Sequence, residues 1–443
     1  MELYNITMNS KTNMISTVFN FVADRKNLMR FWLYGMLFLD SVIRFLTGGQ
    51  YEFIRTVLFR WLIVAWTVLI LLNDLRLQRW IKEKTVLALD AFLVICVISY
   101  LYNWPSSLPL LIGQIMYCHI FYSIPLFYKK EEFFQELNRF FNIFVITTFF
   151  LSLISLVLLV TKMDFVIPFF TRIPYSDLFF NDGPHAFGGA NRYHGLYTHA
   201  VPGSLECCLS IAASCYLLKG RKINKFFFSF NLLVQLVMIY LSDTRTAFLY
   251  LILFAALLLF DVLRNKVGTK VAVFSSLCTI LVLLGILFLL KRNHFEQVLA
   301  SLSTDFYRTL DAYSSGRLEI WTTCIQSALR HPLLGDGWYN NTASYNIGYP
   351  FAHNAFVNIF VYTGILGLIA IIVFIGLYIH ELCKAKEKRD TILSAIVLCI
   401  LLESLFENIL IGEMSHIETG LFWLLLGYTA FADKFIPSED TSL

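Results

Sequence analysis

The chain has 443 residues, of which 57% are hydrophobic and only 15% are charged. Soluble domains carry about 25% charged residues, so this composition excludes an ordinary soluble protein and indicates an integral membrane protein. The net charge of +4 is small, and the basic residues form short clusters without a continuous stripe or recognition motif. We therefore expect no nucleic-acid partner.

The N-terminal segment MELYNITMNSKTNMISTVFNF lacks the basic start and apolar core of a cleavable signal peptide. We expect the first membrane helix to act as the insertion signal instead. Most of the nine cysteines lie inside apolar runs, so we expect neither a disulfide framework nor a CxxC metal site.

Apolar stretches close to the ~20 residues needed to cross a bilayer recur along the chain. They predict an all-α polytopic membrane protein with about 12 transmembrane helices, and about 11 to 13 if the weakest stretches are counted differently. With no internal repeat and no separate soluble domain, residues 1–443 form a single integral membrane domain. The predicted spans are 31–47, 57–72, 85–104, 108–128, 140–160, 200–218, 226–241, 246–263, 270–290, 355–379, 391–411 and 417–435.

Charge in the connecting loops predicts the orientation, because Lys and Arg are retained on the cytoplasmic side. Alternate loops are basic: NDLRLQRWIKEK, KKEEFFQELNR, KGRKINK, RNKVGTK and HELCKAKEKRD. Twelve spans with both termini in the cytoplasm place every one of these loops in the cytoplasm.

Two long polar segments, 161–199 and 291–354, then form outer loops, and loops of this length are usually functional. The second one contains apolar residues at the 3–4 spacing of a helix, which predicts a short amphipathic helix from Arg317 with Ser315 as its N-cap. We expect its apolar side, which includes Trp321, to lie at the outer membrane surface. The apolar residues are Leu318, Trp321, Ile325 and Leu329.

Three arginines fall on the outer side, against the usual charge bias. Arg192 lies in GGANRYHGLYTHA, Arg245 in the turn LSDTRTAFLYL and Arg317 in SSGRLEIW. A guanidinium binds phosphate bidentately and stays charged at any pH, so together they predict an anion-binding clamp. The alternatives are interfacial or loop-structuring roles for Arg192 and Arg317, and a surface ion pair with Asp243 for Arg245.

His353 and Asn354 open the tenth predicted span in PFAHNAFVNIFVYTG. An imidazole can take up a proton near neutral pH, so His353 is a candidate general base, with helix capping as the alternative. Asn354 either holds the imidazole in one tautomer, binds substrate hydroxyls or caps the helix. His194 and His199 beside Arg192 do not have the spacing of a metal site, and we expect no metal.

Glu403 and Glu407 lie in LLESLFENILIGEM, within the eleventh predicted span. A charged group inside a span is a functional candidate, and residues four apart share a helix face. Glu407 is therefore a candidate substrate-binding residue. The alternative is a buried ion pair with an arginine such as Arg44 or Arg60.

Three motifs in order, SDTRTAFLYL, SSGRLEIWTTCIQSALRHPLLGDGW and HNAFVNIFVYTGILGL, resemble the O-antigen ligase/polymerase family of bacterial membrane glycosyltransferases. The resemblance implies inverting sugar transfer from a polyprenyl-pyrophosphate donor without metal, nucleotide sugar or other cofactor. It also implies that Arg245 and Arg317 bind the pyrophosphate and that His353 activates the acceptor hydroxyl. Arg192 matches a less uniform family position, and no family carboxylate can be assigned to Glu403 or Glu407.

The resemblance further implies a multi-pass protein of the bacterial cytoplasmic (inner) membrane, with its site facing the periplasm or exterior. Its substrates would be undecaprenyl-pyrophosphate-linked oligosaccharides as donor and acceptor, reached from membrane lipid, with a chain-length regulator protein as a further partner. The compact HPLLGDGW…FAHN stretch favours a polymerase of O-antigen, capsule or exopolysaccharide. The alternatives are an O-antigen ligase acting on lipid A core and, from another class, a lipid-linked oligosaccharide flippase or transporter, which would distribute charges through the middle of its helices.

Overall fold

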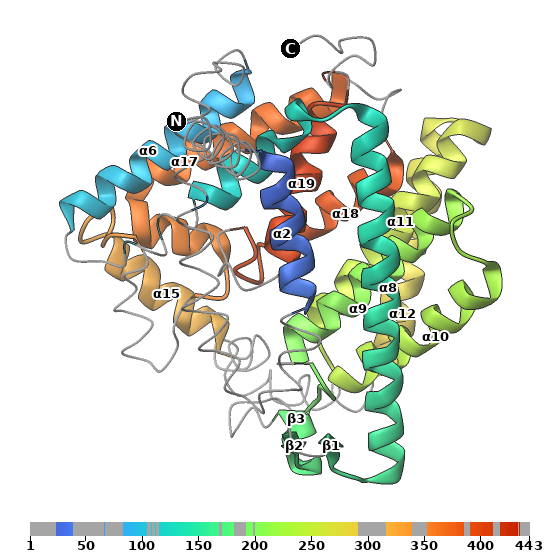
Figure 1. Ribbon diagram of the computed structural model, residues 1–443. Coiled ribbons are helices and arrows are strands. Elements are labelled where there is room, and N and C mark those ends of the chain that lie inside the picture. The colour runs from blue at the N-terminus through green and yellow to red at the C-terminus, as the bar shows by residue number, and fades with distance from the viewer. Residues whose placement is uncertain are drawn as a thin grey trace, which may run out of the picture.

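The described part of the chain is a helical bundle (Figure 1), seen here in a computed structural model. The structure describes residues 24–38, 66, 83–103, 108, 111, 115–167, 171–180, 192–197, 200–290, 316–338, 352–384, 390–410, 417–432 and 434. The long helices are α6 (Lys84–Tyr102), α8 (Lys130–Thr161), α9 (Ala200–Lys219), α10 (Lys225–Ser242), α11 (Arg245–Val267), α12 (Thr269–Leu290) and α17 (Ala355–Lys384). The shorter ones are α2 (Arg25–Phe38), α15 (Arg317–Ala328), α18 (Thr391–Glu403) and α19 (Ile417–Ala430).

Within the described residues, the seven long helices are long and apolar enough to cross a membrane, and α18 and α19 are shorter apolar helices. The predicted all-α polytopic membrane class is confirmed. Most of the predicted spans 31–47 and 57–72 falls outside the described residues, so the total of about 12 remains a prediction. The predicted span 108–128 contains a π-helical turn, η4 (Met116–Phe121), and a 3₁₀ turn, η5 (Ile124–Phe127).

Contacts at the helix ends show which helix termini lie together at each end of the bundle. At one end, Lys219, the last residue of α9, pairs with Asp390 before α18 at 2.8 Å, and Thr391 bonds to Asp261 of α11 at 3.0 Å. The opposite end contains the last turn of α8 and leads into a β-hairpin, seen at the bottom of Figure 1. We call it the hairpin end. Because neighbouring helices alternate in direction, it also contains the first turns of α9 and α11.

Two small antiparallel sheets lie in the loop after α8. Strand β1 (Phe165–Ile167) pairs with β2 (Thr171–Ile173), and β3 (Phe179–Phe180) pairs with β4 (Arg192–Tyr193). No strand is predicted from sequence in this segment, because strands of two or three residues are too short to show an alternating apolar pattern. The second sheet fixes the backbone around Arg192.

Helix α17 is interrupted at Gly364, where φ is 64° and ψ is −164°. The segment 332–336 packs into the break, so that Asp336 N donates to Val361 O at 2.7 Å and Ile365 N donates to Pro332 O at 2.8 Å. Ser99 of α6 donates to Tyr362 O at 2.6 Å. Carbonyl groups released by the break thus regain partners, as membrane burial requires. The predicted span 355–379 lies within the candidate membrane helix Ala355–Leu382, and this break interrupts it.

Helix α15 begins at Arg317, as predicted, but its N-cap is Gly316 with φ 76°, and Ser315 lies outside the described residues. The buried face consists of Ile320, Cys324 and Ala328, which faces α17. Ile325 and Leu329 of the predicted apolar side do not belong to this buried face, since they are 39% and 60% exposed, and the placement of that side at the outer membrane surface stays a prediction. Both faces carry apolar residues at helical spacing, so periodicity alone does not show which one packs against the protein.

Candidate functional site

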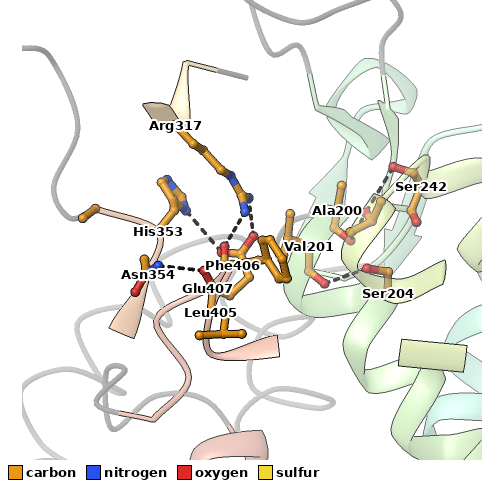
Figure 2. Close-up of polar contacts among 12 residues, drawn as sticks. Ala200, Val201, Ser204, Ser242, Arg317, His353, Asn354, Leu405, Phe406 and Glu407 are labelled. Carbon is orange, nitrogen blue, oxygen red and sulfur yellow. Dashed lines mark hydrogen bonds and ion pairs between the residues drawn. The ribbon is translucent and has the colours of Figure 1, made fainter. Parts of the chain in front are cut away.

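Arg317, Glu407 and His353 meet at the junction of α15, α17 and the turn after α18 (Figure 2). Arg317 Nη2 lies 2.5 Å from Glu407 Oε1, and its Nη1 donates to the carbonyl of Phe406. His353 Nδ1 lies 3.2 Å from Glu407 Oε2. His353 and Glu407 lie 36 and 90 positions after Arg317 along the chain, and direct polar contacts join the three residues. We call them the Arg317–Glu407–His353 cluster.

Glu407 occupies a turn rather than a helix. Helix α18 ends at Glu403, so the prediction that Glu403 and Glu407 share a helix face in a span reaching residue 411 is wrong. The alternative of a buried ion pair with an arginine is confirmed, but the partner is Arg317; Arg44 and Arg60 lie outside the described residues.

The Glu407 side chain is ionised in this environment although it is almost entirely buried. Burial raises the pKa of the carboxyl, but the neighbouring Arg317 and His353 side chains outweigh burial and lower the pKa to about 2. An ionised carboxylate can only accept hydrogen bonds. Glu407 therefore acts as an acceptor for both of its neighbours.

The backbone holds His353 in an unusual conformation. Its φ is 49°, in the left-handed region that non-glycine residues seldom adopt. Residues held in such conformations cluster at functional sites. The preceding residue is fixed from both sides, since Trp321 Nε1 donates to Ala352 O at 2.7 Å and Ala352 N donates to Asn358 Oδ1 at 2.9 Å. The sequence analysis did not select Asn358 as a residue that supports the backbone before His353. The polar amide within the apolar segment FVNIF could have indicated such a role.

Asn354 caps α17. Its Oδ1 accepts from Phe356 N at 2.9 Å and from Val357 N at 3.0 Å, while its Nδ2 donates to Leu405 O at 2.8 Å. The capping alternative thus describes the observed geometry. Its predicted contact with substrate hydroxyls stays a prediction.

Arg245 is the first residue of α11. Cys399 of α18 contacts Tyr250 O, and Thr391 contacts Asp261, so the two helices run antiparallel. Tyr250 lies five residues after Arg245, and Ser404 lies five residues after Cys399. At 1.5 Å rise per residue, Arg245 and Ser404 are at about the same height in the bundle. Arg245 is therefore at the level at which the turn carrying Glu407 begins.

Arg192 lies in β4, also at the hairpin end. The next residue, Tyr193, donates its hydroxyl to the carbonyl of Ser155 in α8, and Leu196 N donates to Ser155 Oγ at 3.0 Å. The structure thus joins Arg317, His353 and Glu407 by contact, with Asn354 adjacent, and places Arg192 and Arg245 at the same end of the bundle.

The arrangement suits binding of an anion next to a group that can accept a proton. Arg317 has five N–H groups and uses only some of them on Glu407 and Phe406, so others remain for a second anion. Among the described residues, no group of three or more His, Cys, Asp or Glu side chains is placed to hold a metal ion.

Residues 230–372 match the family model described as O-antigen ligase. The resemblance seen in the sequence motifs is confirmed for these residues. The matched segment contains Arg245, Arg317, His353 and Asn354, whereas Arg192 and Glu407 lie outside it. The match supports a glycosyltransferase-like membrane enzyme that acts on lipid-linked glycans. None of the curated proteins matches the chain.

Proposed function

We propose that this protein is a polysaccharide polymerase that joins undecaprenyl-pyrophosphate-linked repeat units by inverting glycosyl transfer at the outer face of the bacterial cytoplasmic membrane. The observation that supports it most directly is the Arg317–Glu407–His353 cluster, which combines a guanidinium with an imidazole at the end of the bundle where Arg245 also lies. A pyrophosphate leaving group needs cations, and an acceptor hydroxyl needs a base.

In the proposed reaction, the acceptor oxygen attacks the anomeric carbon of the donor sugar from the face opposite the pyrophosphate. The hydroxyl proton passes to the imidazole of His353 as the new C–O bond forms. The bond between the anomeric carbon and the pyrophosphate oxygen breaks, and its electron pair leaves with undecaprenyl pyrophosphate. Arg317 and Arg245 stabilise the negative charge that develops there. The configuration at the anomeric carbon inverts.

A ligase would use the same residues, so the choice between the two depends on the acceptor. The compact HPLLGDGW…FAHN stretch looks more like polymerases than ligases, and its segment 332–336 packs into the break of α17. This compactness, together with the motif resemblance, favours the polymerase. Lipid A core as acceptor is the second candidate.

The test uses purified full-length protein in lipid nanodiscs with an undecaprenyl-pyrophosphate-linked repeat unit, without nucleotide sugar and with a chelator. Longer glycans should form, and His353→Ala, Arg245→Ala and Arg317→Ala should each lower the rate by about 100-fold or more. The chain offers matched controls in the exposed residues Arg330 and His331, whose replacement by alanine should leave the rate within about twofold.

Outcomes can separate the alternatives. Transfer to added lipid A core without formation of longer chains would replace the polymerase by the ligase. Full elongation by all three alanine variants would exclude the proposed mechanism.

A further inference from the structure

We propose that Glu407 is a positioning residue that sets the tautomer and orientation of His353 and at the same time orients Arg317. Its carboxylate accepts a hydrogen bond from the N–H at Nδ1 of His353. The lone pair of the ring then lies on Nε2, where it can face the acceptor hydroxyl. This inference rests on the proposed function for its catalytic consequence. The structural part, the tautomer, can be tested without any activity measurement.

The contacts of Glu407 argue against the substrate-binding role expected from sequence. Its Oε1 accepts from Arg317 and its Oε2 faces His353 Nδ1, so each oxygen already faces a protein group. The residue is only 7% exposed. A sugar hydroxyl would have to displace one of these partners to reach the carboxylate.

The chemistry of the pair decides which ring nitrogen carries the proton. A carboxylate has no proton to donate, so the close approach of Oε2 requires an N–H at Nδ1 of His353. In the neutral ring the lone pair then lies on Nε2, and this is the atom that can accept the hydroxyl proton. Once protonated, the imidazolium remains beside a negative charge, which stabilises it. This is the role of the carboxylate in carboxylate–histidine catalytic pairs generally.

The same carboxylate fixes the cation. Arg317 donates through Nη2 to Glu407 and through Nη1 to the neighbouring carbonyl of Phe406, a two-point contact that holds the plane of the guanidinium. The turn after α18 therefore sets the separation between His353, the proposed base, and Arg317, the proposed pyrophosphate-binding group. Misplacement of reacting groups by about 1 Å can cost roughly 100-fold in rate, so such support is needed.

The decisive variant is Glu407→Gln, which keeps the shape of the side chain. Because Arg317 only donates, the glutamine oxygen must face Arg317, and its amide N–H then faces Nδ1 of His353. The ring is expected to change to the Nε2–H tautomer. The ¹⁵N spectrum of histidine-labelled protein in nanodiscs reports this directly, with the His353 signal assigned by its loss in His353→Gln.

The kinetic expectation separates positioning from substrate binding. Glu407→Gln should lower kcat by about 10²- to 10⁴-fold, as the wrong tautomer does elsewhere, while the KM for the lipid-linked donor changes by less than about threefold. Glu407→Asp, which keeps the carboxylate, should recover part of kcat. The matched control is Glu319→Gln, at an exposed position of α15, which should alter neither tautomer nor rate.

Three results would overturn the inference: an Nε2–H tautomer of His353 in the unaltered protein, no tautomer change in Glu407→Gln, or a raised KM with unchanged kcat. Failure of the proposed function would give another combination of results. The unaltered protein would then show the Nδ1–H tautomer of His353, but the glycan of the lipid-linked donor would not be elongated. Thermal unfolding of each variant identifies any that fail to fold.

Discussion

At the scale of single residues, Glu407 links the stability of the site to pH. Its pKa falls from an ordinary 4.5 to about 2 in the folded protein. A carboxyl with a lowered pKa contributes stability that is fully present above its unfolded pKa and is lost as the pH falls through its folded pKa. The contribution of Glu407 should therefore persist down to about pH 4.5 and disappear towards pH 2.

The difference in Tm between the unaltered protein and Glu407→Gln should measure this contribution. We expect no narrowing of the difference between pH 8 and pH 5, because this whole range lies above the ordinary pKa of 4.5 of the Glu407 carboxyl. Narrowing should begin below about pH 4.5. A difference that already shrinks between pH 8 and pH 5 would contradict the ionised buried carboxylate.

Asn354 allows capping to be distinguished from substrate binding. Asn354→Ala removes the acceptor for Phe356 N and Val357 N and should cost about 1 kcal/mol of stability. Asn354→Ser retains a good N-cap and should unfold close to the unaltered protein, with the KM for the donor unchanged in both variants. An equal rise in KM in both variants would instead show that the amide contacts the substrate.

At the scale of secondary-structure elements, the break in α17 receives the 332–336 turn, and we expect this packing to support the position of His353. A Cβ at Gly364 would come within 2.4 Å of the carbonyl of Leu333, and the φ and ψ of Gly364 lie in a region essentially restricted to glycine. Gly364→Ala must therefore displace either the 332–336 turn or the first part of α17. We expect a loss of more than about 2 kcal/mol in stability and a lower kcat.

The control for this prediction lies in the same helix. Gly376 has no atom within 4 Å of where its Cβ would be, so Gly376→Ala should be neutral or stabilise α17 by up to about 1 kcal/mol. Thermal unfolding and the elongation assay measure both variants. Equal behaviour of the two would show that the docked turn does not position His353.

The elements differ in how far sequence could predict them. Helix α15 was predicted with its correct first residue, because Gly316–Arg317 opens a clear 3–4 apolar pattern. Its buried face was not predicted, since that depends on the shape of α17. The end of α18 at Glu403 was also missed: LLESLFENIL reads as a continuous apolar segment, and only the contacts of Ser404 and Leu405 with residues 354 and 355 show that the chain turns there.

At the scale of the whole molecule, the helix directions predict opposite sides of the membrane for two exposed positions. Lys162 follows the last turn of α8 at the hairpin end, and Lys222 lies in the turn between α9 and α10 at the other end. In spheroplasts, a membrane-impermeant thiol reagent should label Lys162→Cys directly and Lys222→Cys only after permeabilisation. The reverse pattern would invert the proposed orientation and place the site in the cytoplasm.

The membrane class and the ends of most long helices follow from apolar length and loop charge, which are properties of local sequence. The cluster does not, because Arg317, His353 and Glu407 come from three separate segments. Sequence reasoning selected all three residues, yet it assigned Glu407 to the substrate, since a carboxylate in an apolar run shows that it needs a partner but not which one. Only the packing of the turn after α18 shows that the partners are Arg317 and His353.

Glu407 lies 35 residues beyond the end of the segment that matches the O-antigen ligase family at residue 372. Selection should nevertheless act on this position together with Arg317 and His353, because a change at one alters the partners of the others. In homologous genomes, loss of the acidic residue after α18 should therefore be accompanied by replacement of the arginine or the histidine. An alignment in which these three columns vary independently would show that the residue at position 407 is not needed to position the arginine and the histidine.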